Sequence, residues 1–253
     1  MRASSNGHPG TAKIEETSLE VDLYRGDKQS GGLVTYTIAR QPSQTVLDVV
    51  TAIQREQAPG LAYRFSCRVG MCGSCAMTVN GKPRWTCRTH VDKVAAANRL
   101  VVEPLSNLPH IRDLVVDLST FFDKQQQALG RFMGASEPET DFSSIKPDEA
   151  QRQNADAGIE CIGCAVCYAA CDVVAWQPGY LGPAALNRAW TLQNDRRDTA
   201  RPARLEAIAQ AGGCTTCHSM GSCAAACPKQ LNPTASIAGL KRAVTRRRFG
   251  LPS

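Results

Sequence analysis

The sequence has few aromatic residues, only four histidines and no long hydrophobic run. Aromatic side chains make up 6% of its 253 residues. No apolar stretch approaches the roughly 20 residues that a helix needs to span a bilayer. The first 16 residues contain no apolar core of the kind that a secretory signal has. We therefore expect a protein that is neither secreted nor membrane-spanning, in the cytoplasm, where cysteines stay reduced and available for metal.

The remaining composition is typical of a soluble globular protein, with 43% hydrophobic and 21% charged residues. The formal net charge is +6, and much of it lies near the C-terminal end. Such a patch suits a solvated helix end, an anionic lipid surface or an acidic partner. Because no nucleic-acid-binding module accompanies it, no nucleic-acid partner is expected. The patch consists of Lys241, Arg242, Arg246, Arg247 and Arg248.

The first third of the chain predicts a small sheet packed on one helix. Residues 19–24 and 33–39 have strand patterns, and residues 45–56 space their valines and isoleucine at helical intervals. The pair Asn80-Gly81 is a strong signal for a hairpin turn. A further strand is expected at 99–105.

The rest of the chain is expected to be helical. An apolar stripe predicts a helix over 111–129, so we place a domain boundary near Pro109. The polar stretch 134–158 is expected to be a connector. Helical segments then alternate with two cysteine clusters. The predicted class is α+β, with a flexible segment at 1–17, a β domain at 18–110 and a helical domain at 111–253.

Cysteine is the residue type in which the sequence is rich, with twelve in three groups. The first group has the spacing C-x4-C-x2-C and a distant fourth cysteine, which is the plant-type [2Fe–2S] pattern. Gly70 and Gly73 allow the backbone to wrap closely, so that its N–H groups point at the sulfides. A zinc site, the alternative, usually uses two separated C-x2-C pairs. The expected ligands are Cys67, Cys72, Cys75 and Cys87.

The stretch CIGCAVCYAAC at 161–171 predicts a [4Fe–4S] site. Its C-x2-C-x2-C run brings three thiolates to one cubane, while the fourth cysteine of such a run ligates the other cluster in two-cluster ferredoxins. The second motif, at 214–229, supplies the other half of this exchange. Its last cysteine precedes Pro228 and is the natural fourth ligand. The predicted set is Cys161, Cys164, Cys167 and Cys227.

The third group lacks one thiolate. A full run would need a cysteine at position 220, where the chain has Met220, and a thioether is a poor ligand for such a cluster. A [3Fe–4S] cluster is therefore expected on Cys171, Cys217 and Cys223. Cys214 is left over. It is interpreted as a spare buried thiol, the alternative being that it moves in as a ligand.

At this point the chain resembles the iron–sulfur subunit of succinate dehydrogenase and quinol:fumarate reductase. The resemblance covers about residues 18–245. The segments that carry it are SCRVGMCGSC, LPHIRDLVVD, CIGCAVCYAAC, GPAAL, the RRD at 196–198 and CHSMGSCAAACPKQLNP. It implies a plant-ferredoxin-like β-grasp domain, then an all-α bacterial-ferredoxin-like domain, with the [2Fe–2S], [4Fe–4S] and [3Fe–4S] clusters in that order.

The resemblance also implies a function and partners. Electrons would pass between a flavoprotein subunit, which alone carries FAD, and membrane menaquinone or ubiquinone. The chain would lie peripherally on the cytoplasmic side of the inner membrane, held by anchor subunits. No dicarboxylate site is expected on this chain. The alternatives are a soluble fumarate reductase subunit using a non-quinone donor and a zinc-binding interaction protein.

Two residues resemble the family's quinone contacts. His218 follows a predicted [3Fe–4S] ligand and has a ring that can relay a proton, and the indole N–H of Trp176 can donate to a quinone oxygen. Their alternatives are a backbone hydrogen bond and hydrophobic cover. Trp85 is expected only to cover a cluster. Cys171 is followed by Asp172 instead of the usual proline, and this carboxylate should lower the potential of the last cluster.

Overall fold

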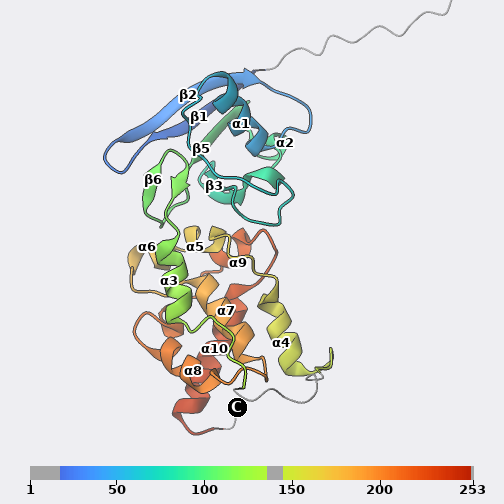
Figure 1. Cartoon of the computed structure of the whole chain (residues 1–253), viewed down its shortest axis with the longest axis vertical. Coiled ribbons are helices and arrows are strands. Elements are labelled where there is room, and N and C mark those ends of the chain that lie inside the picture. The colour runs from blue at the N-terminus through green and yellow to red at the C-terminus, as the bar shows by residue number, and fades with distance from the viewer. Residues whose placement is uncertain (1–17, 136–144, 252–253) are drawn as a thin grey trace, which may run out of the picture.

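The computed structural model describes residues 18–135 and 145–251, so the segment 1–17 that is expected to be flexible lies outside the described residues. A β-rich half occupies one end of the long axis and a bundle of helices the other (Figure 1). The α+β class is confirmed. No helix within the described ranges combines the length and apolar character needed to cross a bilayer.

A five-stranded sheet forms the first half. Its strands run in the order β2-β1-β5-β3-β4, with β1 and β5 parallel and the other pairs antiparallel. Alternation along the first strand buries Leu19, Val21 and Leu23 against the helix side, as period-2 geometry requires. The strands are β1 (Ser18–Gly26), β2 (Gly31–Ala39), β3 (Ala76–Val79), β4 (Lys82–Trp85) and β5 (Arg99–Glu103).

The predicted helix of this half is α1 (Val46–Glu56), and a capping box fixes its start. The Thr45 side chain accepts from the Asp48 N–H, and the Asp48 carboxylate accepts from the Thr45 N–H at 3.0 Å. Val46, Val49 and Ile53 are fully buried in the core shared with the sheet. A short helix, α2 (Val91–Val94), follows the hairpin β3–β4.

The prediction of a helix over 111–129 is wrong for residues 111–118. Residues 110–116 form the hairpin of β6 (His110–Arg112) and β7 (Val115–Val116), and α3 (Ser119–Gln127) begins only afterwards. The reason is Asp113, which is 2% exposed and takes a φ of +48°. Its carboxylate accepts hydrogen bonds from Arg25 Nε at 3.1 Å, Gly26 N at 3.0 Å and Ala62 N at 2.8 Å.

These tertiary hydrogen bonds outweigh the helical periodicity of the segment, because an unpaired buried carboxylate is costly. Burial raises the pKa of Asp113, but the N–H groups of Ala62 and Gly26 and the Arg25 guanidinium more than compensate, and the pKa is lowered. Leu114, next in sequence, packs in the core of the sheet half. The hairpin therefore anchors the connection to the β-rich half.

The helical half packs around α7 (Pro183–Gln193) and α10 (Pro233–Arg248), which contact each other. Its core includes Phe121, Tyr168, Tyr180, Leu186 and Ile237, all at most 3% exposed. This half also contains α5 (Val166–Ala169), α6 (Asp172–Trp176), α8 (Arg201–Ala209) and α9 (Ser222–Ala226).

The polar stretch 134–158 was expected to be a connector, but its second part forms a helix, α4 (Ala150–Ile159). Residues 136–144 of the stretch lie outside the described ranges. The helix packs on α7 through Gly158. A Cβ at Gly158 would stand 2.6 Å from Thr191 Oγ1, and Asn187 Nδ2 lies 3.4 Å from the Gly158 carbonyl oxygen. Close packing on a neighbour stabilises a helix that its own polar sequence does not signal.

A buried ion pair fixes the far end of the helical half. Arg204 and Asp198 have fully buried side chains, with Arg204 Nη2 2.9 Å from Asp198 Oδ2. Arg204 also donates to the carbonyls of Leu129 and Arg131. The pair thus joins α8 to the segment that follows α3.

Replacing Arg204 with Met should lower the free energy of unfolding by about 3–5 kcal/mol, because Asp198 would remain as a buried, unpaired charge. The matched control is Arg247→Met, which breaks the exposed pair with Glu206 and should cost less than about 1 kcal/mol. The measurement is the denaturation midpoint of the purified holoprotein. Adding Asp198→Leu to Arg204→Met should recover part of the loss; equal midpoints for the two single variants would contradict the buried pair.

Candidate metal centres

The first cysteine group lies on a loop between α1 and β3 and on the 3₁₀ turn Thr86–Arg88 after β4. The backbone N–H groups of Met71 and Cys72 lie 3.2 and 3.3 Å from Cys67 Sγ. Gly70 and Gly73 take φ values of +74° and +73°, which favour glycine. The loop therefore wraps its N–H groups around a thiol, as expected from the glycines.

The fourth cysteine of this group is held next to the third by Thr86. Its N–H and its hydroxyl both donate to the Cys75 carbonyl, at 3.2 and 2.8 Å. Cys75 and Cys87 are buried, and burial, followed by the hydrogen bond with Cys75, raises the pKa of Cys87 to about 11. At the opposite side of the loop, the Ser74 hydroxyl and then the Cys67 N–H lower the pKa of Cys72 to about 6.

The second group converges from two distant motifs. Cys161, Cys164 and Cys167 line one cavity with Cys227, which comes from the end of α9. Burial raises the pKa of Cys161, Cys164 and Cys167, and the neighbouring thiols of the group raise it further. The chain crossing that the x3 gaps predicted thus brings Cys227 to the first motif.

The third group lines a separate cavity. Cys171, Cys217 and Cys223 line a cavity together with His218, Met220 and Tyr180. The Ser219 N–H lies 3.3 Å from Cys217 Sγ, and Thr234 Oγ1 lies 3.3 Å from Cys223 Sγ. Lys241 Nζ donates to the Cys217 carbonyl at 2.6 Å, which ties this loop to α10.

Cys214 and Met220 occupy opposite environments. Cys214 is fully buried in the core of the helical half and does not line the third cavity. Met220, at the position where a fourth thiolate would stand, is 54% exposed. The structure therefore brings three thiols to the third cavity.

The two proposed quinone contacts differ in placement. His218 is exposed and lines the third cavity. Trp176, at the end of α6, is 68% exposed and is not among the lining residues of that cavity. The interpretation of Trp176 as hydrophobic cover is inconsistent with that exposure.

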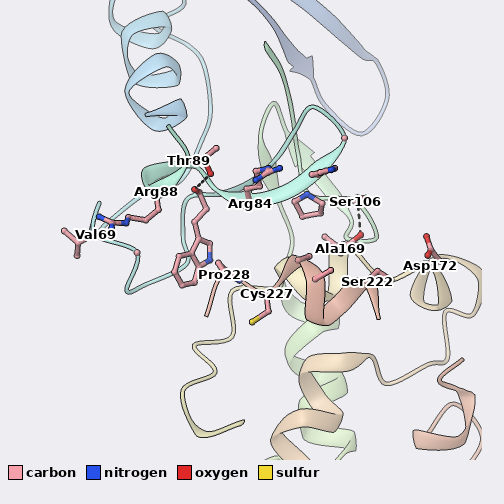
Figure 2. Close-up of a pocket in the computed structure, with 18 residues that line it drawn as sticks. Val69, Arg84, Arg88, Thr89, Ser106, Ala169, Asp172, Ser222, Cys227 and Pro228 are labelled. Atoms are coloured by element: carbon pink, nitrogen blue, oxygen red, sulfur yellow. Dashed lines mark hydrogen bonds between the residues drawn. The ribbon is translucent and has the colours of Figure 1, made fainter. Parts of the chain in front are cut away.

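The loop of the first group packs closely on Cys164 of the second group at Gly73. A Cβ on Gly73 would stand 2.4 Å from Cys164 Cβ and 3.0 Å from Cys164 Cα. Cys75 and Cys87 share an apolar cluster with Trp85 and Val166, and Cys164 packs against it. Beside this contact an 860 Å³ cleft separates the halves (Figure 2), with Arg84 and Arg88 on the β side and Ser222 and Cys227 on the helical side.

The donor set fits iron–sulfur clusters. Within residues 18–135 and 145–251, no three His, Cys, Asp or Glu side chains are arranged to hold a single metal ion. The cysteines of the second and third groups line cavities, and backbone N–H groups lie near the sulfurs of Cys67 and Cys217. Thiolate ligands supported by such N–H groups are typical of protein-bound clusters.

Two family descriptions match the chain and define its class. "2Fe-2S iron-sulfur cluster binding domain" matches residues 18–123, and "4Fe-4S dicluster domain" matches residues 160–232. The chain is an iron–sulfur protein with ferredoxin-like domains of both kinds.

Whole-chain similarity narrows this class. The chain is 34% identical over 231 residues to the fumarate reductase iron-sulfur subunit of Haemophilus influenzae, covering 87% of this chain and 90% of the relative. It is 37% identical over 198 residues to the succinate dehydrogenase [ubiquinone] iron-sulfur subunit 1, mitochondrial, of Oryza sativa subsp. japonica, covering 78% and 70%. The chain belongs to the family of succinate dehydrogenase and fumarate reductase iron–sulfur subunits.

A solved structure agrees with this membership. A chain of the Mycobacterium smegmatis Sdh1 complex in the apo form superposes with a TM-score of 0.83 at 28% identity, covering 92% of this chain and 97% of that one. The expected resemblance to the family is therefore confirmed over nearly the whole length.

Three residues that contact the cysteine groups or line their cavities were not predicted as such from the sequence. Ser74 follows a glycine in the first loop, and only its contact with Cys72 distinguishes it from other loop serines. Tyr180 lines the third cavity, although it is distant from every cysteine in sequence. Gly73 was expected to shape its own loop, and its contact with Cys164 depends on how the halves meet.

Replacing Gly73 with Ala should disturb both of the first two centres, because the added Cβ would force the loops apart. The matched control is Gly81→Ala, which has a similar φ of +72° but nothing within 4 Å of the added Cβ. Both variants carry the same backbone strain of roughly 1–2 kcal/mol. The measurements are iron per chain and the EPR spectra of the reduced centres. If Gly73→Ala matches Gly81→Ala in both, the loops do not touch.

Proposed function

We propose that this chain carries electrons between a flavoprotein subunit and a membrane quinone through three iron–sulfur clusters. The observation that carries the proposal is the series of three cysteine groups, which ends at a cavity with three thiols and an exposed histidine. When bound, such clusters accept and donate single electrons at potentials that the surrounding protein sets.

The proposed ligand sets follow the three groups. Cys67, Cys72, Cys75 and Cys87 hold a [2Fe–2S] cluster. Cys161, Cys164, Cys167 and Cys227 hold a [4Fe–4S] cluster, and Cys171, Cys217 and Cys223 hold a [3Fe–4S] cluster. Their placement on separate cavities supports the last two assignments.

Short connections keep the three sites in series. Gly73 brings the first loop against Cys164 of the second site. Cys167 lies on α5, and Cys171 directly follows Ala170, the residue that caps the C-terminal end of α5, so one short helix joins the second and third sites. The Asn107 side chain donates to the carbonyls of Tyr168, Ala169 and Cys171 and holds the end of this helix against the connection to the β-rich half.

The partners would contact opposite ends of this series. Val69 and Met71, on the first loop, are 61% and 63% exposed, which supports contact with an FAD-bearing subunit. Met220, which lines the third cavity, and Trp176, at the end of α6, are exposed apolar residues that support contact with membrane anchor subunits and quinone. The chain would then lie peripherally on the cytoplasmic side of the inner membrane.

The proposed role of His218 is to deliver a proton where the electron leaves. It follows a ligand of the third site and lines the cavity that holds Cys217 and Cys223. Asp172, the first residue of α6, lines the same cavity, and its carboxylate would lower the potential of the third cluster by disfavouring added negative charge.

The anaerobically purified protein should contain about nine irons per chain (two, four and three) and little zinc, as the ligand sets require. Cys214→Ser should leave all three cluster spectra intact because its thiol is in the core, whereas the matched Cys217→Ser should lose the oxidised [3Fe–4S] signal. Metal analysis and EPR check both. Four irons per chain, or loss of the third signal in Cys214→Ser, would contradict the assignment.

His218→Ala should spare the clusters and markedly reduce turnover with quinone, while turnover with an artificial acceptor at the flavin stays normal. Both rates are measured in parallel on the assembled complex. A parallel fall would mean that His218 supports the fold, and unchanged rates would remove it from the quinone site. A complex that never reduces quinone, with wild-type His218, would favour a soluble fumarate reductase with a non-quinone donor.

A further inference from the structure

Trp85 lies between the first and second cysteine groups. It is the last residue of β4, two positions before Cys87, and it is 6% exposed. It packs in one apolar cluster with Cys75, Cys87, Leu47 and Val166, and Cys164 of the second group packs against the same cluster. Its neighbours therefore include ligands proposed for two different clusters.

The two ends of the indole ring have different surroundings. A Cβ on Gly70 would stand 3.3 Å from Trp85 Cε3, so the six-membered ring covers the first loop. The ring nitrogen Nε1 is buried and makes no hydrogen bond to any residue in the described ranges 18–135 and 145–251. A buried donor without an acceptor destabilises the fold, and native structures rarely contain one.

The nearby acceptor is Cys164, which packs against the cluster that contains the Trp85 ring. Burial raises the pKa of the Cys164 thiol, and the Val166 N–H and the Trp85 indole act in the opposite direction as donors. The indole N–H makes no hydrogen bond to Cys164 that meets the usual geometric limits, and a neutral thiol is a weak acceptor. A thiolate bound to iron carries negative charge and accepts much more strongly.

We propose that Trp85 donates its indole N–H to the Cys164 thiolate of the second cluster and thereby raises the reduction potential of that cluster. The proposal rests on the ligand sets proposed above. It assigns the tuning of the second site to a residue of the β-rich half, beyond the hydrophobic cover that the sequence suggested.

The direction of the effect follows from charge. Reduction adds an electron to the cluster, and part of the added charge falls on the ligand sulfurs. A donor aimed at one of these sulfurs interacts more favourably with the reduced state than with the oxidised one. Hydrogen bonds to sulfur are among the factors that set such potentials. Because the N–H is buried, water does not screen this interaction.

The test is Trp85→Phe, which keeps an aromatic ring over Gly70 and removes only the donor end. The matched control is Trp190→Phe, the same substitution on α7, where the ring packs on Gly239. EPR-monitored redox titration of the assembled complex should show a lower potential for the second cluster in Trp85→Phe. The first cluster in that variant, and all clusters in Trp190→Phe, should keep the wild-type potential. An unchanged second potential, or an equal shift in the first cluster, would overturn the proposal.

A second measurement needs no substitution at Trp85. The chain has three tryptophans. Their indole nitrogens are labelled with nitrogen-15 in the wild-type complex. Pulsed EPR of the reduced second cluster should then show a coupled indole nitrogen, and Trp190→Phe should retain it. If the second cluster gives a normal signal but shows no coupled indole nitrogen, the proposal for Trp85 is overturned and the ligand sets are unaffected. Absence of the second-cluster signal itself, with low iron, instead contradicts the ligand sets.

Discussion

The approach of Gly73 to Cys164 constrains how the two halves of the chain meet. No side chain beyond hydrogen fits between the loops, because a Cβ at Gly73 would overlap Cys164. The surrounding contacts serve this one junction. Asp113 ties the connecting hairpin to β1, and Asn107 ties the same connection to the end of α5. The halves are thus held on both sides of the place where the first two sites touch.

A second constraint is the removal of thiols from water. Cys75, Cys87 and Cys223 are buried, and burial is the largest contribution to the raised pKa of Cys87 and Cys223. A buried thiol is a neutral, weak hydrogen-bonding group, so the fold alone leaves these sites with few strong interactions. In the proposed ligand sets, ligation would convert the thiols into thiolates that the nearby N–H groups can stabilise. Metal binding at these sites would then also stabilise the fold.

The sequence predicted those features that depend on local spacing. Strand alternation, the helical spacing of residues 45–56 and the Asn80-Gly81 turn are encoded within a few residues, and the structure contains the corresponding elements. Features that depend on tertiary contacts were not predictable. Residues 111–118 have helical periodicity, yet the hydrogen bonds to Asp113 draw them into a hairpin. Helix α4 forms in a polar segment because Gly158 allows it to lie directly on α7.

The same distinction applies within the sites. The x3 gap before Cys227 indicated its transfer to the first motif, since ligand spacing reflects cluster geometry, and the structure places it there. Trp85 gave no such signal, because its neighbours come from both halves. At the third site the local pattern predicted a missing ligand, and the environments of Cys214 and Met220 are compatible with that prediction. Cys214 is locked in the core, whereas Met220 turns to the surface beside His218. The third cavity is therefore lined by three thiols, with an exposed Met220 at the position where a fourth thiolate would stand.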